Sequence, residues 1–338
     1  MSAPAAQTER YIEKLTRELG EPIIKQLNDA ATEDIVLNPD GRLWVKSVGN
    51  GFTPFGVMTE SQALSAFGTL AAMKGTVINH DKPILETDLP LDGSRFEGII
   101  APVVPKPVFA IRCRPRKVFT LNDYASAQIL TNKQDPINRP RERDRFPETI
   151  QGCDHVEIVR RAIIQKKNIL IVGSTGSGKT TMVNAVLHEI GQVAPNDRVL
   201  LIEDTTELQC MVKNYVGLLA VGSVTMLDCL RACMRLKPDR IVVGEVRGPE
   251  AHTMLKAWNT GHPGGAATVH ANDAVSGLRR LECLVAEATA APQQALIAEA
   301  VDVVLFIDEE PALPAGRKVR EVIVVLGYEN GQYIAQHV

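Results

Sequence analysis

The 338-residue chain has almost no excess charge, few aromatic residues and no long apolar run. Its formal net charge is −3, and Phe, Trp and Tyr make up only 4% of it. A surface that binds nucleic acid needs a basic face and aromatic rings for stacking, so we expect no direct nucleic-acid binding. No apolar stretch approaches the roughly 20 residues of a membrane-spanning helix. Residues 1–10 also lack the apolar core of a signal peptide. These absences predict a cytoplasmic protein, whose membrane contact would be peripheral and from the cytoplasmic side.

The six cysteines include no C-x-x-C pair. A zinc module built from four cysteines is therefore not expected. In a chain of this size, the pattern is typical of reduced and mostly buried thiols. Cys229 and Cys233 share one helix face at the i, i+4 spacing, which favours core packing over a shared metal ion.

Length and pattern predict two domains. In residues 1–130, a turn at 38–41 joins two short strands, and Thr59 begins a helix that stops before Gly75. Strands and helices do not alternate regularly there, which predicts a smaller α+β domain. In residues 150–338, strands that are apolar throughout alternate with helices. That pattern predicts an α/β domain with a mainly parallel sheet covered on both faces.

The predicted elements can be given by residue range. In the N-terminal part they are helix 11–19 ended by Gly20, strands 35–37 and 43–45, helix 59–73, and strands 96–104 and 108–112. In the C-terminal part they are helix 156–164, strand 169–172, helix 179–190 ended by Gly191, strand 199–202, helix 225–236, strand 241–243, helix 249–258, strand 266–269, helices 274–284 and 293–300, and strands 303–307 and 319–326.

The segment between the two domains, 131–149, is rich in arginine and proline and poor in apolar residues. It predicts a solvated basic linker. Acidic Glu142 and Asp144 interrupt the arginines, and no aromatic residue lies among them. Contact with a neighbouring domain is therefore favoured over contact with lipid, and lipid over nucleic acid.

The most informative segment is residues 169–181, I-L-I-V-G-S-T-G-S-G-K-T-T. Four apolar residues predict a buried strand, and 173–180 then match G-x-x-x-x-G-K-[ST] without a mismatch. The glycines let backbone N–H groups converge on a polyphosphate, Lys179 neutralises the outer phosphates, and the Thr180 hydroxyl can ligate Mg²⁺. The helix that follows adds its positive dipole end. The predicted residues that bind nucleotide are Gly173, Ser174, Thr175, Gly176, Ser177, Gly178, Lys179, Thr180 and Thr181.

Hydrolysis also requires carboxylates at the carboxyl ends of neighbouring strands. Strand 199–202 runs into Glu203, and strand 241–243 runs into Gly244 and Glu245. A carboxylate there can hold a magnesium ion or orient and deprotonate the attacking water. We therefore predict that Glu203, Glu245 and the hydroxyl of Thr180 lie around the metal. Which glutamate is the general base stays open at this point.

His270 ends the strand 266–269, again at the ligand edge of the sheet. A histidine in that place can sense a γ-phosphate and link it to a moving segment. It can equally be satisfied by nearby backbone groups, and its chemistry alone does not separate the two interpretations.

Four motifs in order resemble the secretion (traffic) ATPase superfamily. G-S-T-G-S-G-K-T, L-L-I-E-D-T-T-E-L, V-V-G-E-V-R and T-G-H-P-G-G-A-A-T-V-H-A-N match its Walker A, Asp-box, Walker B and His-box motifs across about 150 to 310. N-P-D-G-R-L-W-V and L-D-G-S-R-F-E-G-I-I-A-P-V-V are similar to the conjugative-transfer branch of type IV secretion. The tetracysteine module of many type II secretion relatives is absent, which counts against that branch.

The resemblance implies a RecA-like P-loop ATPase domain and a homohexameric ring, with ATP held between the N-terminal and C-terminal domains. By motif position it makes Glu203 the Asp-box acid, Glu245 the Walker B glutamate, and His270, with His262, the His box. It also implies partners among the inner-membrane components of a secretion channel.

The resemblance further implies that two arginines of the N-terminal domain reach the nucleotide. The matching positions are Arg95 and Arg112. A planar guanidinium can clamp a γ-phosphoryl group and so couple domain closure to its presence. On pattern alone, both would be exposed strand arginines.

The resulting hypothesis is a Mg²⁺-dependent ATPase whose hydrolysis cycle moves one domain against the other. That motion would power pilus assembly or substrate transfer in conjugation. The alternatives are a pilus-retraction or type II assembly ATPase, a nucleic-acid translocase on the same core, and a nucleotide switch without catalysis.

Overall fold

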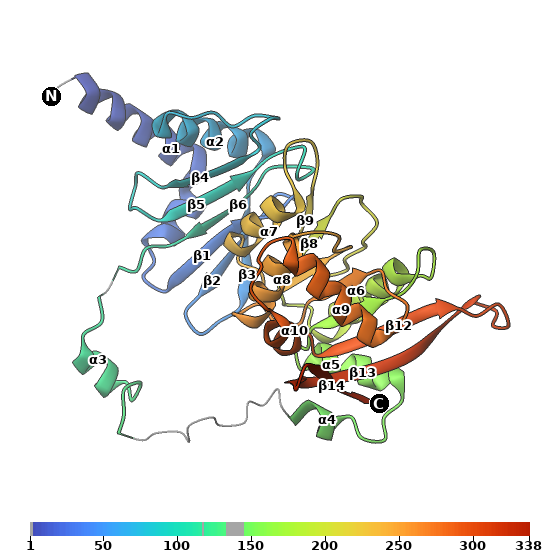
Figure 1. The fold of residues 1–338 in the computed structure, drawn as a ribbon. Helices are drawn as coiled ribbons and strands as arrows, with labels where there is room; N and C mark the ends of the chain where they lie inside the picture. The colour runs from blue at the N-terminus through green and yellow to red at the C-terminus, as the bar shows by residue number, and fades with distance from the viewer. Residues whose placement is uncertain (1–2, 117, 133–144) are drawn as a thin grey trace.

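The computed structural model describes residues 3–116, 118–132 and 145–338. Two sheets organise this part of the chain (Figure 1). One has six strands in the order β3-β2-β1-β6-β5-β4, and the other has eight in the order β14-β13-β12-β7-β11-β10-β8-β9. Most of the predicted basic linker, residues 133–144, lies outside the described residues.

The six-stranded sheet is antiparallel throughout, with helices packed on one face. Leu15 and Phe67, from the two long helices, pack with Phe109 of the sheet in one apolar cluster. The elements are α1 (Ala3–Asn28), β1 (Thr32–Leu37), β2 (Arg42–Ser47), β3 (Phe52–Val57), α2 (Glu60–Lys74), β4 (Ile84–Asp88), β5 (Arg95–Ile99), β6 (Val108–Arg112) and, apart from the sheet, α3 (Leu121–Ser126).

The structure confirms the predicted ends of helix α2. The Thr59 hydroxyl accepts from the N–H of Gln62 in a capping box, and Gly75 takes the left-handed conformation at φ 70°. The predicted end of the first helical segment at Gly20 is confirmed, because Gly20 has non-helical angles (φ 78°, ψ 161°). The second segment of α1, which continues beyond this kink to Asn28, was not predicted. Pro22 lies just after the kink, where a missing N–H costs little.

Two further strand predictions in this half need correction. The strand predicted over 96–104 ends at Ile99, because Pro102 and Pro105 cannot donate to a ladder. The short edge strands β3 and β4 were not predicted, since half-exposed edges give no clear alternation of apolar and polar residues.

The eight-stranded sheet is mainly parallel, as predicted. Strands β9, β8, β10, β11, β7 and β12 pair in parallel, and β13 and β14 extend the sheet as antiparallel strands. The elements are α4 (Phe146–Thr149), α5 (His155–Ile164), β7 (Ile169–Val172), α6 (Lys179–Val193), β8 (Val199–Glu203), β9 (Tyr215–Leu219), α7 (Met226–Arg235), β10 (Arg240–Val243), α8 (Glu250–Asn259), β11 (Ala266–Val269), α9 (Ala274–Ala286), α10 (Gln294–Ala300), β12 (Val303–Glu309), β13 (Arg317–Glu329) and β14 (Gln332–His337).

Helices cover both faces of this sheet. Along β7, Ile169 and Ile171 pack in the cluster that contains α5 and α6, whereas Leu170 and Val172 pack in the cluster that contains α7 to α10. This alternation explains why the strand is apolar at every position.

Some predicted ends of helices and strands in the C-terminal half were wrong. Helix α6 continues past Gly191 to Val193, because glycine is tolerated in a last helical turn. The final strand pair is longer than predicted, and the edge strands β9 and β14 were missed. β14 is mostly exposed and therefore lacks an apolar pattern.

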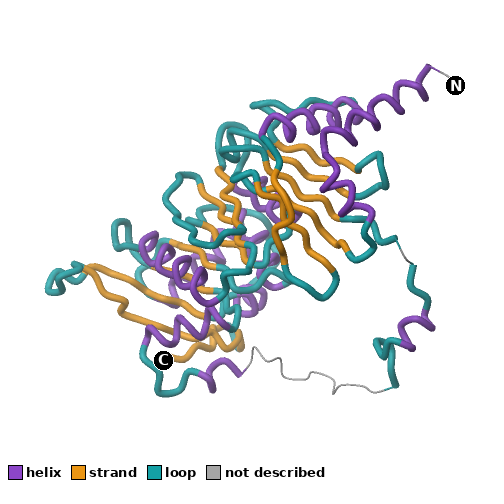
Figure 2. Tube along the Cα trace, turned by 180° about the vertical axis from the view of Figure 1, so that it is seen from behind, coloured by secondary structure: helices purple, strands orange, loops and turns teal. Residues whose placement is uncertain are grey.

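The two sheets are distinct groups of strands in Figure 2 but share buried contacts. The Asn38 side chain donates to Oδ1 of Asn214 at 2.9 Å, and the Leu219 N–H donates to the Val103 carbonyl at 2.8 Å. Trp44 belongs to the same apolar cluster as strands of the second sheet. The domain limits 1–130, 131–149 and 150–338 stay a prediction.

Within the described ranges, no helix has the length and apolar character that crossing a membrane requires.

Candidate active site

The predicted phosphate loop lies between strand β7 and helix α6. Gly176 and Gly178 have φ values of 79° and 99°, which favour glycine. Gly173 is packed so closely that an added Cβ would lie 2.3 Å from the Ile307 carbonyl oxygen. The glycines therefore allow a tight loop whose end becomes the first turn of α6.

A cavity of about 760 Å³ lies above this loop. Among the described residues, all those lining it belong to the second half of the chain. They are Thr175, Gly176, Gly178, Lys179, Thr180, Thr181, Glu203, Asp204, Thr205, Glu207, Gly244, Glu245, Val246, Arg247, His270, Arg280 and Arg317. Of the predicted loop residues that do not border the cavity, Gly173 and Ser177 are buried, and the Ser174 carbonyl accepts from Lys179.

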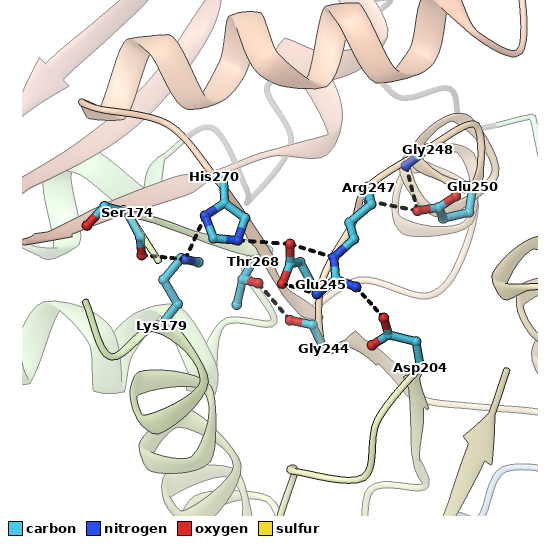
Figure 3. A network of polar contacts seen from close by, with 10 residues as sticks. All are labelled: Ser174, Lys179, Asp204, Gly244, Glu245, Arg247, Gly248, Glu250, Thr268 and His270. Atoms are coloured by element: carbon cyan, nitrogen blue, oxygen red, sulfur yellow. Dashed lines mark hydrogen bonds and ion pairs between the residues drawn. The ribbon is translucent and has the colours of Figure 1, made fainter. Parts of the chain in front are cut away.

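A continuous chain of polar contacts crosses the cavity (Figure 3). Nζ of Lys179 donates to the Ser174 carbonyl at 2.8 Å and lies 3.2 Å from Nδ1 of His270. Nε2 of His270 lies 3.0 Å from Oε1 of Glu245. A neutral imidazole with its proton on Nε2 satisfies both contacts. The loop lysine, the histidine and one glutamate thus form a single connected group.

Arg247 extends this chain. It donates to both oxygens of Glu245, from Nε at 2.8 Å and from Nη2 at 2.9 Å, and also contacts the Asp204 carboxylate. The backbone N–H groups of Arg247 and Gly248 donate to Glu250 at 2.8 and 2.9 Å, so the start of α8 holds the segment in place. These contacts link the carboxyl ends of strands β8, β10 and β11.

Burial lowers the pKa of Lys179, and the nearby positive charge of Arg247 lowers it further, while Glu245 opposes the shift. Burial alone would raise the pKa of Glu245. Hydrogen bonds from Arg247, with the nearby His270 and Lys179, outweigh burial and lower that pKa below its usual range. Glu245 is therefore a carboxylate at neutral pH, as a base must be.

Glu203 is buried, and its Oε1 accepts from the N–H groups of Glu207 and Leu208, both at 2.8 Å. One oxygen of this carboxylate thus holds the loop that follows β8. The side chain also borders the cavity beside Asp204. Glu203 and Glu245 therefore lie at the same cavity in different settings, since Glu203 accepts from backbone N–H groups and Glu245 contacts the side chains of Arg247 and His270.

Other predicted residues lie elsewhere in the chain. Arg95 and Arg112 border a second cavity of about 830 Å³, which His262 also borders. Nδ1 of His262 lies 2.9 Å from the Pro238 carbonyl oxygen. Within one chain, the structure brings together Lys179, His270 and the two glutamates, but not the two arginines or His262.

Pattern reasoning did not assign several residues that border the phosphate-loop cavity. Arg247 lies two positions after Glu245, inside the V-V-G-E-V-R segment, which could have drawn attention to it. Asp204 and Glu207 follow the Asp-box strand. Arg280 and Arg317 lie far along the chain, and no local signal marks either one.

The cavity suits a magnesium ion that is held largely by phosphate and water. The described residues contain no group of three or more His, Cys, Asp or Glu side chains placed to hold a metal. The Thr180 hydroxyl and the carboxylates of Glu203, Asp204 and Glu245 do border the cavity. This is an oxygen donor set, which Mg²⁺ prefers, and nucleotide phosphates commonly complete its coordination. Cys229 and Cys233 are both buried in the apolar core, consistent with a packing role.

Comparison with known proteins gives consistent similarities. Residues 152–309 match the family of type II/IV secretion system proteins. The chain is 42% identical over 328 residues to the conjugal transfer protein TrbB of Rhizobium radiobacter, covering 97% of this chain and 94% of that protein. It is 30% identical over 308 residues to VirB11 of Agrobacterium fabrum, covering 86% and 88%. The crystal structure of the VirB11 ATPase from the Brucella suis type IV secretion system, in complex with sulphate, superposes with a TM-score of 0.83 at 25% identity, covering 94% of this chain and 96% of that one.

Proposed function

The chain belongs to the TrbB-like branch of the type IV secretion ATPases. On that premise we propose that it is a Mg²⁺-dependent motor, and that it hydrolyses ATP in the cavity above residues 173–180. The observation that carries the proposal is the chain of contacts from Lys179 through His270 to Glu245 across that cavity. We assign the α/β domain to the RecA-like P-loop type, since its sheet places the loop and the acids at one edge.

ATP binding requires Lys179 to exchange its present partners. The ammonium group now bonds to the Ser174 carbonyl and to His270. Phosphate oxygens are stronger partners, because both groups are charged. Once Lys179 turns to the phosphates, Nδ1 of His270 loses its donor, and this nitrogen can bond to a γ-phosphate oxygen when it carries a proton of its own. His270 therefore connects phosphate occupancy to Glu245.

Glu245 is the residue that we assign as general base. It accepts the proton of a water whose oxygen attacks the γ-phosphorus, and the bond from that phosphorus to the bridging oxygen breaks to give ADP and phosphate. Its lowered pKa keeps it ionised. Glu203 orders the loop after β8 and adds negative charge beside the metal position. Arg247 holds Glu245 before nucleotide binds.

Thr180, with Glu203 and Glu245, would hold the magnesium ion directly or through water. Bound there, the ion would neutralise charge that develops on the phosphates. The residues themselves already provide the loop amides and Lys179 for the same purpose.

Arg95 and Arg112 border a different cavity of the same chain. We therefore place them at the phosphates of a neighbouring copy in a homohexameric ring. Arg198 is fully buried and donates to Asn38 at 2.6 Å, so the two sheets of one chain are held together by a buried contact. This favours movement at the boundary between copies over movement between the sheets of one chain.

The cellular role that we propose is to power conjugation, through pilus assembly or substrate transfer at a type IV secretion channel. TrbB is the relative that carries this role in its name. The ring would act in the cytoplasm, at the cytoplasmic face of the inner membrane, with the channel's membrane components as partners. Loss of plasmid transfer in a host that carries Lys179→Ala, with recovery by the wild-type gene, tests this role.

Phosphate release and nucleotide binding test the chemistry. Lys179→Ala should lose both, because the loop loses its cation. Glu245→Gln should still bind ATP but turn over at least about a hundredfold more slowly, since a general base is removed. Glu299→Gln makes the same acid-to-amide change at an exposed position of α10, away from the cavity, and should match wild type. Wild-type turnover by Glu245→Gln would show that Glu245 is not the base, and chelation of Mg²⁺ should stop hydrolysis.

Mixing two inactive variants tests the arginines and the ring together. Lys179→Ala copies have intact arginines, and Arg112→Ala copies have an intact cavity. If Arg112 acts on the next copy, mixed rings should regain part of the activity that neither variant has alone. Mixed rings without activity would contradict action between copies. Mass measurement with and without ATP and Mg²⁺ gives the number of subunits.

A further inference from the structure

The hairpin of β12 and β13 extends beyond the sheet edge where the phosphate loop begins (Figure 1). Strand β7 ends at Val172, whose partner on β12 is Phe306. Strand β12 continues to Glu309, which pairs with Arg317. Three residues of strand reach about 10 Å. Arg317 is therefore carried past the end of β7, to the level of the loop.

The hairpin is braced in this position. The Glu310 N–H donates to the Gly316 carbonyl at 2.9 Å, which closes the turn, and Gly316 has a φ of 66°. The guanidinium of Arg320 lies 3.3 Å from the Asp308 carboxylate and 3.4 Å from that of Glu310. Arg320 thus ties the two strands together. Arg317 has no such role in the hairpin.

Arg317 lies against the phosphate loop. A Cβ added to Gly178 would lie 2.3 Å from Nη1 of Arg317, so the guanidinium occupies the space beside that glycine. Arg317 also borders the phosphate-loop cavity. Within the described ranges the one hydrogen bond of the Arg317 side chain is long, from Nε to the Ala315 carbonyl at 3.3 Å, and no carboxylate lies in ion-pair contact with the guanidinium. Arg247, by contrast, is engaged by Glu245 and Asp204.

The strand order shows which end of the nucleotide Arg317 faces. On one side of β7 lie β11, β10 and β8. His270 and Glu245 follow the carboxyl ends of β11 and β10, and Glu203 is the last residue of β8. The γ-phosphate must point to that side, because the assigned base is there. Strands β12 and β13 lie on the other side of β7. Arg317 therefore approaches the loop from the side opposite the reaction.

We propose that Arg317 binds, in the same chain, the phosphates that ADP and ATP share, and so sets the affinity for both nucleotides without taking part in the chemistry. The inference rests on the proposed ATPase function and adds a nucleotide-binding residue to it. A free guanidinium fork beside loop amides is a strong partner for phosphate oxygens.

Binding of ADP and of a non-hydrolysed ATP analogue to Arg317→Ala tests the proposal, together with steady-state kcat and KM. We expect Kd for both nucleotides and KM for ATP to rise by the same factor, about tenfold or more, with kcat within twofold of wild type. Arg317→Lys keeps the charge but loses the fork, so its Kd should fall between those of wild type and Arg317→Ala.

Lys318→Ala is the matched control, because it removes an exposed cation from the next position of the same strand, and Lys318 does not border the cavity. It should leave Kd within twofold of wild type. An equal loss in Lys318→Ala would assign the effect to the general positive charge of the hairpin and overturn the proposal. So would an unchanged Kd for ADP in Arg317→Ala, or a lower kcat at unchanged Kd. If wild type bound no nucleotide, the proposed function would fall as well. If wild type hydrolyses ATP and Arg317→Ala binds and hydrolyses nucleotide as well as wild type does, only the assignment of Arg317 falls.

Discussion

Arg198 joins the two sheets through contacts that are entirely buried. Its Nη1 donates to Oδ1 of Asn38 at 2.6 Å and also contacts the Asn214 side chain. Nε donates to the Leu236 carbonyl at 2.8 Å, and the guanidinium lies 5.7 Å from the centre of the Phe52 ring. Asn38 lies in the turn after β1 and Phe52 lies in β3 of the first sheet. Removal of the Arg198 side chain therefore tests how firmly the two sheets are joined.

The size of the effect follows from two opposing contributions. Three hydrogen bonds from a charged donor stabilise the fold by about 6 kcal/mol in all. Burial lowers the pKa of Arg198 from 12.5 to about 10, which corresponds to a cost of about 3 kcal/mol for keeping the charge inside. We therefore expect Arg198→Ala to lower the free energy of unfolding by about 3 kcal/mol. Arg198→Met fills the space and also removes the cost of burying the charge. Its free energy of unfolding should therefore fall by about 1 kcal/mol less than that of Arg198→Ala.

Urea denaturation followed by circular dichroism measures both variants against wild type. Arg231→Ala is a suitable control, because its side chain is 63% exposed and lies 3.8 Å from Asp228. Such a surface pair should change the free energy of unfolding by less than about 0.5 kcal/mol. If Arg198→Ala unfolded within that same margin of wild type, the buried contact would not hold the sheets together, and the reasoning would be refuted.

Two further predictions concern buried groups. Burial raises the pKa of Glu97 from 4.5 to about 8, and neither oxygen has a hydrogen-bond partner among the described residues, with Nε of Arg235 at 3.9 Å. The folded state therefore holds this proton more tightly than the unfolded state, so the free energy of unfolding should fall as pH rises from about 4.5 to 8. Glu97→Gln should remove that slope in urea titrations at several pH values, and a slope that persists would show that another group causes it. Burial raises the pKa of Cys229 to about 12 and raises that of Cys233, while Cys283 is exposed. An aromatic disulfide reagent should therefore modify Cys283 in the native protein and reach Cys229 and Cys233 only after unfolding, and rapid native labelling of either would contradict their burial.

Sequence patterns were sufficient to predict features that are formed by residues close together in the chain. Helix α2 depends on a capping box at Thr59 and a left-handed Gly75, all within the helix and its ends. The phosphate loop depends on glycines at 173, 176 and 178 between a buried strand and a helix. Such features need only a few consecutive residues, so their spacing can be recognised before the fold is known.

Contacts between segments far apart in the chain could not be predicted from such patterns. Arg317 reaches the loop only because β12 pairs with β7 and then continues past it, a consequence of strand order and length. The second segment of α1, from the kink at Gly20 to Asn28, is similar, since Leu19 and Ile23 on either side of the break pack into the same core. Tertiary packing decided both outcomes, and neither leaves a signal in a short window.

The distribution of arginines around the two cavities argues that one chain holds only part of the machinery. The phosphate-loop cavity of a chain contains the acids, the histidine and Arg317, but Arg95 and Arg112 border the other cavity. The sheet that carries those two arginines is joined to the second sheet by the buried Arg198. A movement that brought them to their own chain's phosphates would have to break that contact, at the cost worked out above. Delivery to a neighbouring copy needs no such break, so we expect the smallest catalytic unit to be a pair of adjacent copies.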